Sequence, residues 1–381
     1  MATLNKKFAA YYLIIFLAIA IYSNGQNRFV LEGTIGKYPI VMLVNEFETN
    51  LDVTYFYKKY RHDIRLSGEK NIHGIYTFSK RKIGSKPEGD VLEEFRICLD
   101  KNNEWKGTWR NQKAVVLPVS LKKINPFDYH FQEIPDMDFG NLESQVYTKA
   151  RLAGIEFHKN SITSYGTYSL EWVTEPITKI KSFRIIKGFP DTLLKKINNV
   201  LTQKHFLDIE SYYECEGRGE NDGVYETTIH GYFISPDYIS IQKNVFWICA
   251  PAHPGEGDNS FTIDAIKGTE IKYLDDLAWF TGKKPPPVTS DAYLNNYTVA
   301  RGKALAAILT KLYPNEMRKQ DTNDPCDYSR SVYWEFPSWY FTDKGLYIGP
   351  NFPHVTSSAC NSPVFSIIPY TILKQYLASE K

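Results

Sequence analysis

The chain has 381 residues, with 45 lysines and arginines against 43 aspartates and glutamates. This balance argues against a nucleic-acid-binding protein, which normally carries a basic excess or stripe. The aromatic content of 15% excludes a disordered chain and is typical of a strand-rich protein.

Residues 1–25 have the pattern of a secretory signal peptide. Two lysines precede an uncharged, apolar run over residues 8–22, and the small residues Ser23 and Gly25 suit signal peptidase. We expect cleavage near Gly25/Gln26 and a mature chain that is secreted or periplasmic. The run is shorter than the roughly 20 residues that cross a bilayer, although an uncleaved anchor is the alternative. No other segment is apolar enough, so we expect no stable membrane span in the mature chain.

The mature chain of about 355 residues is too long for one ordinary domain. We expect an all-β module over residues 26–124, a linker over 125–150 and an α+β domain over 151–381. The linker contains Pro126 and Pro135 and shows no sustained hydrophobic period.

The all-β module contains eight short apolar segments separated by turn residues. This spacing predicts an all-β sandwich or a small barrel. Trp105 and Trp109 flank the clearest hairpin, and we expect them to pack in the core rather than to form a ligand platform.

The α+β domain has two segments with helical spacing. One begins near Pro190 and continues through Leu201, and the other runs from about Asp291 to Tyr313. The remaining apolar segments predict an antiparallel sheet that these two main helices cover. The segments predicted as strands include 210–219, 331–336 and 363–377.

The five cysteines include no C-x-x-C pair, which gives little support to a zinc ribbon or a redox motif. In an oxidising compartment we expect Cys215 to pair with Cys249 and Cys326 with Cys360, although sequence order leaves other pairings open. Cys98 is then left over, and we expect it to be a small buried hydrophobic residue rather than a nucleophile.

The C-terminal half carries an ordered series of short motifs. A T-x-x-G-L turn is followed by I-P-Y-x-x-L, and upstream lie an A-H-P turn, a T-x-D hairpin and a D-L pair. The residues concerned are Ala252, His253, Pro254, Thr262, Asp264, Gly268, Asp276, Leu277, Thr342, Gly345, Leu346, Ile368, Pro369, Tyr370 and Leu373.

Over residues 180–379 this series resembles the extracellular domain shared by RsiV-type anti-sigma factors and PdaC-type peptidoglycan deacetylases. The chain departs from the pattern at Pro251, where the family has glycine. The resemblance implies the fold, an envelope location and engagement of a cell-wall or lysozyme-like ligand. Neither deacetylation nor sigma-factor sequestration carries over to this chain.

His253 lies in a proline-flanked turn with Glu256 and Asp258 close by. A metal site needs three or four ligands with supporting contacts, so we favour a turn histidine bonded to local backbone. Asp275 and Asp276 precede a leucine and are expected to cap a helix.

The aromatic-rich segment 333–341 could form a binding surface for a sugar or a protein, because tyrosine and tryptophan are favoured in such anchors. Packing within strands explains these residues equally well. The predicted binding residues are His253, Asp258, Trp339, Tyr340, Tyr347 and Phe352.

The chain contains no G-x-S-x-G, H-E-x-x-H, Walker A or dinucleotide-binding motif. We therefore predict no catalytic residue, metal or cofactor. The sequence favours an exported, non-catalytic binding or sensor-like envelope protein whose partner is a lysozyme-like protein or a peptidoglycan fragment. The alternative is an envelope hydrolase that acts on peptidoglycan or another glycan.

Overall fold

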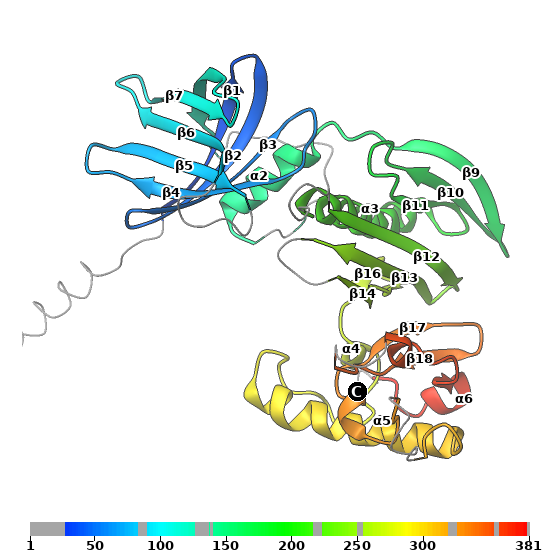
Figure 1. Ribbon diagram of the computed structural model, residues 1–381. Coiled ribbons are helices and arrows are strands. Elements are labelled where there is room, and N and C mark those ends of the chain that lie inside the picture. Colours follow the sequence, from blue (N-terminus) through cyan, green and yellow to red (C-terminus); the bar gives the residue numbers. More distant parts are fainter. Residues whose placement is uncertain are drawn as a thin grey trace, which may run out of the picture. The chain divides into compact units, whose positions relative to one another are not determined.

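The computed structural model of the chain describes residues 27–82, 90–125, 137, 140–215, 223–249, 254–318, 326–353 and 358–378. The chain divides into two compact units, whose elements Figure 1 labels. The first unit comprises Met1–Ile155 and Tyr213–Gly223, and the second comprises Glu156–Tyr212 and Val224–Lys381. The predicted signal peptide lies outside the described residues.

Eight antiparallel strands of the first unit form a closed barrel (Figure 1). Each strand pairs with the next in the sequence, and β8 returns to pair with β1, where Leu31 stands opposite Lys123. The predicted all-β module is thus confirmed, as a barrel rather than a sandwich. The strands are β1 (Asn27–Ile35), β2 (Tyr38–Phe47), β3 (Asn50–Tyr57), β4 (Ile64–Lys70), β5 (Ile75–Arg81), β6 (Val91–Leu99), β7 (Glu104–Asn111) and β8 (Val116–Lys123).

Apolar side chains of all eight strands fill the barrel. Successive residues of a strand point to opposite faces, so Ile40, Met42 and Val44 of β2 lie in this core together. Trp105 belongs to the core and Trp109 packs against it, which agrees with the packing role expected for both. The middle of the barrel is therefore a packed interior.

Gly68 on β4 lies where the backbone of β5 comes too close for a side chain. A Cβ atom at Gly68 would stand 2.0 Å from the carbonyl oxygen of Thr77 and 2.4 Å from Cα of Phe78. Gly33 and Gly107 are in the same kind of contact with their neighbouring strands. Glycine at these positions permits the close approach of strands that a small closed barrel needs.

Helix α2 (Leu142–Leu152) packs against the outside of β1 and β2. Its first turn is capped by Asn141, whose side chain accepts a hydrogen bond from the N–H of Ser144. The helix overlaps the segment 125–150 that was expected to be a linker, and the polar composition of that segment did not predict a helix. Buried Arg151 forms an ion pair with Asp63, which also accepts a 2.6 Å hydrogen bond from the hydroxyl of Tyr147.

The described residues of the second unit form three antiparallel sheets, in agreement with the predicted α+β class. The first sheet contains β9 (His158–Tyr165), β10 (Tyr168–Thr174) and β11 (Lys181–Lys187). The second sheet contains β12 (Val224–Ile234), β13 (Tyr238–Ile248), β14 (Gly255–Asp258), β15 (Phe261–Asp264) and β16 (Thr269–Ile271). The third sheet contains β17 (Ser338–Phe341), β18 (Gly345–Gly349) and β19 (Ile367–Pro369).

Two long helices organise the two cores of this unit. Helix α3 (Asp191–Glu214) packs Ile197 and Leu201 against the first two sheets, and α5 (Thr298–Leu312) packs Leu305 and Leu309 against the third. Both helices were predicted. The shorter helical elements are α4 (Leu274–Leu277), η1 (Tyr293–Tyr297), η2 (Ser331–Trp334), η3 (Ser358–Asn361) and α6 (Tyr370–Leu373).

Three segments predicted as strands are wholly or partly helical. Residues 210–214 continue α3, because Leu201, His205, Ile209 and Tyr213 recur at a spacing of four and are all buried. Residues 331–334 form a 3-10 turn, and residues 370–373 form a helical turn after Pro369 ends β19. The aromatic and β-branched residues of these segments have a high strand propensity, which is why strands were predicted. Packing in the folded unit makes the segments helical instead.

Cys326 and Cys360 form the expected disulfide, and Cys215 and Cys249 are also disulfide-bonded. Cys98 is a free thiol and is exposed, so the expectation of a buried cysteine was wrong. It follows the inward-facing Ile97 on β6 and therefore points away from the barrel core.

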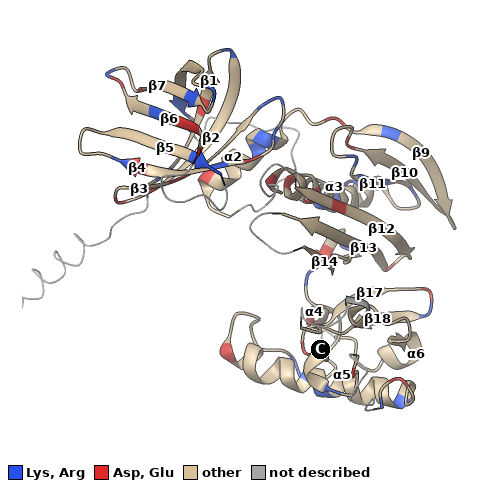
Figure 2. Cartoon of the chain, viewed as in Figure 1, with Lys and Arg blue, Asp and Glu red and all other residues tan. Residues whose placement is uncertain are grey.

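Basic and acidic residues are interspersed along the elements of each unit (Figure 2). No described helix combines the length and the apolar character that crossing a membrane requires.

Candidate functional site

A groove of about 460 Å³ lies in the second unit, where β14 adjoins the segments around β17 and β18. Its walls combine asparagine, serine and carboxylate side chains with aromatic rings and prolines. The lining residues are Asn244, Trp247, Glu256, Gly257, Asp258, Phe336, Pro337, Ser338, Pro350, Asn351, Phe352, Asn361 and Ser362. We call this feature the polar groove.

Trp247 on β13 stands opposite Gly255 of β14. A Cβ atom at Gly255 would come 2.4 Å from the indole ring, and one at Gly257 would come 3.7 Å from it. These two glycines therefore leave the space that the indole occupies against β14. The result is a large flat ring in the wall of the polar groove.

Glu256 and Asp258 are two residues apart on β14, so their side chains leave the strand on the same face. Asp258 also accepts a 2.7 Å hydrogen bond from the backbone N–H of Ser260, which fixes one of its oxygens. The two carboxylates provide hydrogen-bond acceptors along one wall of the groove.

Tyr340 and Tyr347 stand opposite each other on β17 and β18, with ring centroids 4.4 Å apart. Burial, and secondly the charge of Asp258, raises the pKa of Tyr340 to about 12. Burial, the neighbouring Tyr340 and then Asp258 raise the pKa of Tyr347 as well. Both hydroxyls therefore stay protonated at neutral pH, and both tyrosines lie within the electrostatic reach of Asp258.

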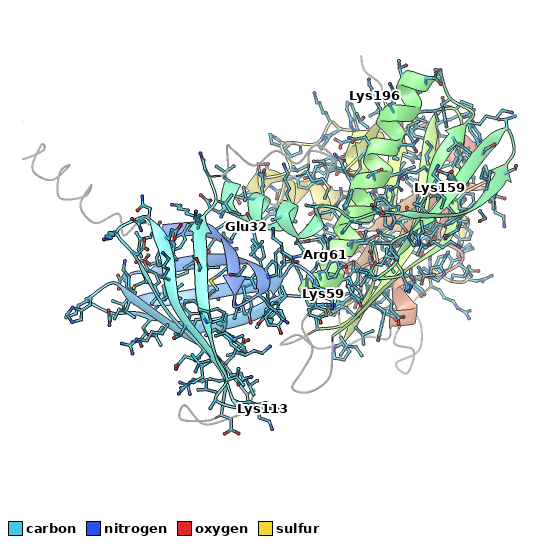
Figure 3. The ribbon with its side chains drawn as sticks, turned by 90° about the horizontal axis from the view of Figure 1, so that it is seen from above. Glu32, Lys59, Arg61, Lys113, Lys159 and Lys196 are labelled. Atoms are coloured by element: carbon cyan, nitrogen blue, oxygen red, sulfur yellow. A yellow bond between two sulfur atoms is a disulfide. The ribbon has the colours of Figure 1, made fainter. Side chains whose placement is uncertain are left out.

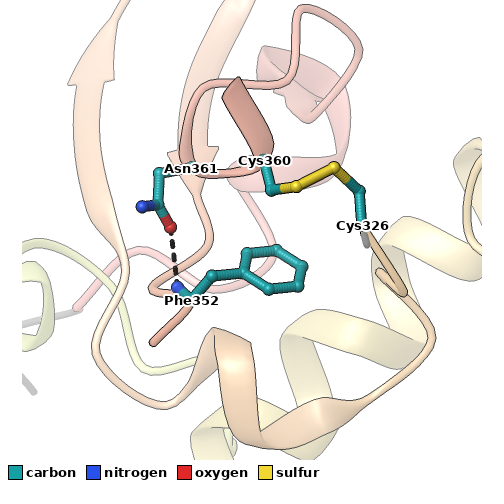
Figure 4. The surroundings of a disulfide bond; sticks show 4 residues. All are labelled: Cys326, Phe352, Cys360 and Asn361. Atoms are coloured by element: carbon teal, nitrogen blue, oxygen red, sulfur yellow. Dashed lines mark hydrogen bonds between the residues drawn. A yellow bond between two sulfur atoms is a disulfide. The ribbon is translucent and has the colours of Figure 1, made fainter. Parts of the chain in front are cut away.

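Phe352 is held in the groove wall by contacts on both its backbone and its ring. Its N–H donates a 2.7 Å hydrogen bond to the side-chain oxygen of Asn361, and its ring centroid lies 4.0 Å from that of Tyr333. Figure 4 shows the ring beside the disulfide between Cys326 and Cys360. The disulfide, the asparagine and the phenylalanine therefore form one small framework that includes two lining residues of the groove.

The predicted binding residues divide into three sets. Asp258 and Phe352 line the polar groove, and Tyr340 and Tyr347 form the stacked pair next to it. Trp339 packs against the hydrophobic core of the third sheet instead. His253 lies outside the described residues.

Of the other aspartates considered from the sequence, Asp264 and Asp276 bond within their own turns, whereas Asp275 bonds distant residues instead of capping a helix. Asp264 accepts hydrogen bonds from two N–H groups of its own turn, and Asp276 accepts one from the N–H of Tyr273 at the start of α4. Asp275 is buried, where it forms an ion pair with Arg301 and accepts a hydrogen bond from Tyr293. Across the described ranges, no three His, Cys, Asp or Glu side chains are placed to hold a metal ion.

The lining residues that were not expected from the sequence include Trp247, Asn244, Asn351 and Asn361. They come from strand and loop segments that meet only in the folded unit. The sole local signal is the G-P-N-F-P sequence around Asn351, in which prolines restrict the backbone on both sides.

The described structure defines a protein of two units, an antiparallel eight-stranded barrel followed by an α+β unit with a polar groove. No protein-family model matches the chain, and no curated protein matches it. Among solved structures, the chain is similar to a member of the DUF3298 family from Bacteroides fragilis. The identity is 14% and the TM-score is 0.31, over 59% of this chain and 94% of that chain.

Proposed function

We propose that the protein is an exported, non-catalytic binding or sensor-like protein of the cell envelope, and that the polar groove binds a cell-wall glycan such as a peptidoglycan fragment. The observation that carries this proposal is the lining of the groove. Amide, hydroxyl and carboxylate groups lie there beside the rings of Trp247, Phe336 and Phe352.

This lining suits a sugar because both the hydroxyl groups and the apolar C–H face of a sugar ring find a partner in it. Sugar hydroxyls donate and accept hydrogen bonds, and the side chains of Asn244, Asn351 and Asp258 offer both roles. The apolar C–H face of a sugar ring carries partial positive charge and packs on the negative face of an aromatic ring such as that of Trp247. A volume of about 460 Å³ is in the usual range for small-ligand sites.

The arrangement of the carboxylates favours binding over hydrolysis. A glycosidase places two carboxyl groups on opposite sides of the bond that it cleaves. Glu256 and Asp258 instead project side by side from one short strand, and the backbone N–H of Ser260 occupies one oxygen of Asp258. We therefore assign these groups to recognition of sugar hydroxyls.

The cysteines support an extracytoplasmic location for this activity. Four of the five are disulfide-bonded, and such bonds persist in oxidising compartments. Together with the predicted signal peptide, they support a location where cell-wall fragments are available.

The test measures binding of the mature chain to soluble peptidoglycan fragments by isothermal titration calorimetry. Trp247→Ala and Asn351→Ala should each weaken binding by about tenfold or more, because each removes a group that contacts the glycan. Tyr273→Ala is the matched control, since Tyr273 is an exposed aromatic residue of the same unit outside the groove.

Parallel assays decide between the alternatives. Release of shorter fragments from peptidoglycan would replace the proposal with a hydrolase. Capture of lysozyme by the mature chain without any glycan binding would replace it with a protein ligand. Equal loss of affinity in Trp247→Ala and Tyr273→Ala would place the ligand elsewhere.

A further inference from the structure

A second cavity, of about 690 Å³, opens at one end of the barrel. It is bordered by the first residues of β1, by the β4–β5 and β6–β7 turns, and by the end of β8. We call this cavity the barrel mouth. The residues that carry the argument are Phe29, Lys70, Tyr76, Leu99, Trp105 and Lys123.

Three aromatic rings form the floor of the barrel mouth. The ring of Phe29 stacks on that of Trp105 with centroids 5.3 Å apart, and Tyr76 meets Trp105 edge-on at 4.7 Å. All three are buried members of the barrel core. Because packed side chains fill the barrel below them, a ligand would rest on this floor rather than thread through the barrel.

Glu46 fixes the polar side of this floor. It is buried and accepts hydrogen bonds from the hydroxyl of Tyr76 at 2.8 Å, the ammonium of Lys70 at 2.6 Å and the amide of Asn27 at 3.1 Å. Burial alone would raise the pKa of Glu46, but these hydrogen bonds outweigh it and lower the pKa. The carboxylate therefore stays charged and neutralises Lys70.

The rim of the barrel mouth is left with an excess of positive charge. Three lysines and one glutamate line it. Glu104 is shared by Lys106 and Lys122. The ammonium of Lys123 lies 5.5 Å from the ring centroid of Phe29, and within the described ranges no carboxylate forms an ion pair with it.

We infer that the barrel mouth binds a small amphipathic carboxylate, with its apolar part on the aromatic floor and its carboxylate at Lys123. Leu99, which is 49% exposed at the rim, extends the apolar surface that such a ligand would cover. Eight-stranded barrels are wide enough to hold one small ligand, and here the packed core limits that ligand to the mouth. This site is separate from the polar groove and does not depend on its function.

The test compares three probes that share a twelve-carbon chain and differ in the head group: dodecanoate, dodecanol and dodecyltrimethylammonium. Each is titrated into the mature full chain by calorimetry, below its micelle concentration. Dodecanoate should bind most tightly and the cationic probe least tightly, because the charge that lacks a carboxylate partner at the rim is positive.

Two variants and one control assign the site. Lys123→Gln should weaken dodecanoate binding by about tenfold and leave dodecanol binding unchanged, because it removes one charge-assisted contact. Leu99→Ser should weaken both probes. Lys113→Gln should change neither, because Lys113 is an exposed lysine in the β7–β8 turn at the other end of the barrel (Figure 3).

Equal affinity for the three head groups, no saturable binding, or an equal effect of Lys113→Gln and Lys123→Gln would overturn the inference. Trp247→Ala should leave dodecanoate binding intact, so failure of the glycan proposal and failure of this one are distinguishable. Lys123 and Leu99 are both exposed, and circular dichroism of each variant verifies that the barrel still folds.

Discussion

The backbone N–H of Phe352 donates a 2.7 Å hydrogen bond to the side chain of Asn361, the residue next to Cys360 of the second unit's disulfide. Phe352 and Asn361 both line the polar groove. The covalent link to Cys326 therefore stabilises the groove wall through one hydrogen bond.

Removing this disulfide should weaken both stability and binding. Cys326 and Cys360 are separated by 34 residues, and the entropy of closing such a loop corresponds to about 3–4 kcal/mol. The double variant Cys326→Ser/Cys360→Ser should unfold at lower urea concentration and bind peptidoglycan fragments more weakly. Asn361→Ala keeps the disulfide. It should weaken binding of peptidoglycan fragments, but it should lower the stability less than the double variant does. Unchanged affinity in the double variant would mean that the disulfide does not support the groove.

A buried ion pair joins α3 to β13 in the same unit. The ammonium of Lys243 donates hydrogen bonds of 2.7 and 2.8 Å to the two oxygens of Asp208, and both residues are buried. Lys243→Met leaves a buried carboxylate without its cation and should cost about 3–5 kcal/mol in urea denaturation. The double variant Asp208→Leu/Lys243→Met should lose much less, because it removes both charges.

The control for the ion pair is Lys204→Met. Lys204 pairs with Glu270 at a partly exposed site, where the loss should be about 1 kcal/mol or less. If Lys243→Met lowered the free energy of unfolding by no more than Lys204→Met does, Asp208 would not be left as an uncompensated buried charge. That result would contradict the buried ion pair.

Much of the barrel could be predicted from the sequence because its hairpins are local. Alternating apolar residues and short turns mark each pair of neighbouring strands. Closure could not be predicted, because it depends on contacts such as Leu31 with Lys123, which are distant in the sequence. Helix α2 was missed for a related reason, since Arg151 and Tyr147 are buried by binding Asp63 of another segment.

The candidate site was only partly predictable. Two of the predicted binding residues, Asp258 and Phe352, line the polar groove. Trp247 and Asn351 were not predicted, since nothing in the local sequence places a strand residue and a loop residue on one groove. Trp339 lies away from the polar groove because side chains alternate along β17: its neighbour Tyr340 stacks on Tyr347, so Trp339 points to the other face and packs on the core.

Gly68→Ala should disrupt the barrel. The added methyl group would lie 2.0 Å from the carbonyl oxygen of Thr77, a backbone atom that cannot move without breaking the pairing of β4 and β5. We expect a loss of more than about 2 kcal/mol in the stability of the barrel, of the size that overpacking produces. Ser67→Ala, at the neighbouring exposed position, is the control and should change stability by about 0.5 kcal/mol or less. Equal stability of the two variants would contradict the close approach of the strands.

Cys98 should be the one thiol of the native protein that reacts with a thiol reagent. It is exposed on β6, whereas the other four cysteines are in disulfides. Titration with Ellman's reagent under native conditions should release one equivalent per chain, and Cys98→Ser should release none. More than one equivalent would show that a disulfide is absent in solution.

His205 should make the stability of the second unit depend on pH. Its ring is buried between α3 and β11, where Nε2–H donates to the carbonyl of Ile180 and Nδ1 lies 3.4 Å from the guanidinium of Arg184. Burial, and secondly the charge of Arg184, lowers the pKa of His205 to about 3. The folded protein therefore holds a neutral imidazole through the whole range in which an unfolded histidine, with a pKa of about 6.5, takes up a proton.

The unfolded chain thus binds more protons than the folded chain between about pH 6.5 and pH 3, so this contribution to stability is complete above pH 6.5 and decreases as the pH falls. Between pH 7.5 and pH 5.0 the loss should be about 2 kcal/mol. Urea denaturation at these two values should show a smaller loss for His205→Gln than for the unmodified chain. His158→Gln, at an exposed position, should retain the full loss. An unchanged pH dependence in His205→Gln would mean that His205 becomes protonated in the folded state at an ordinary pH.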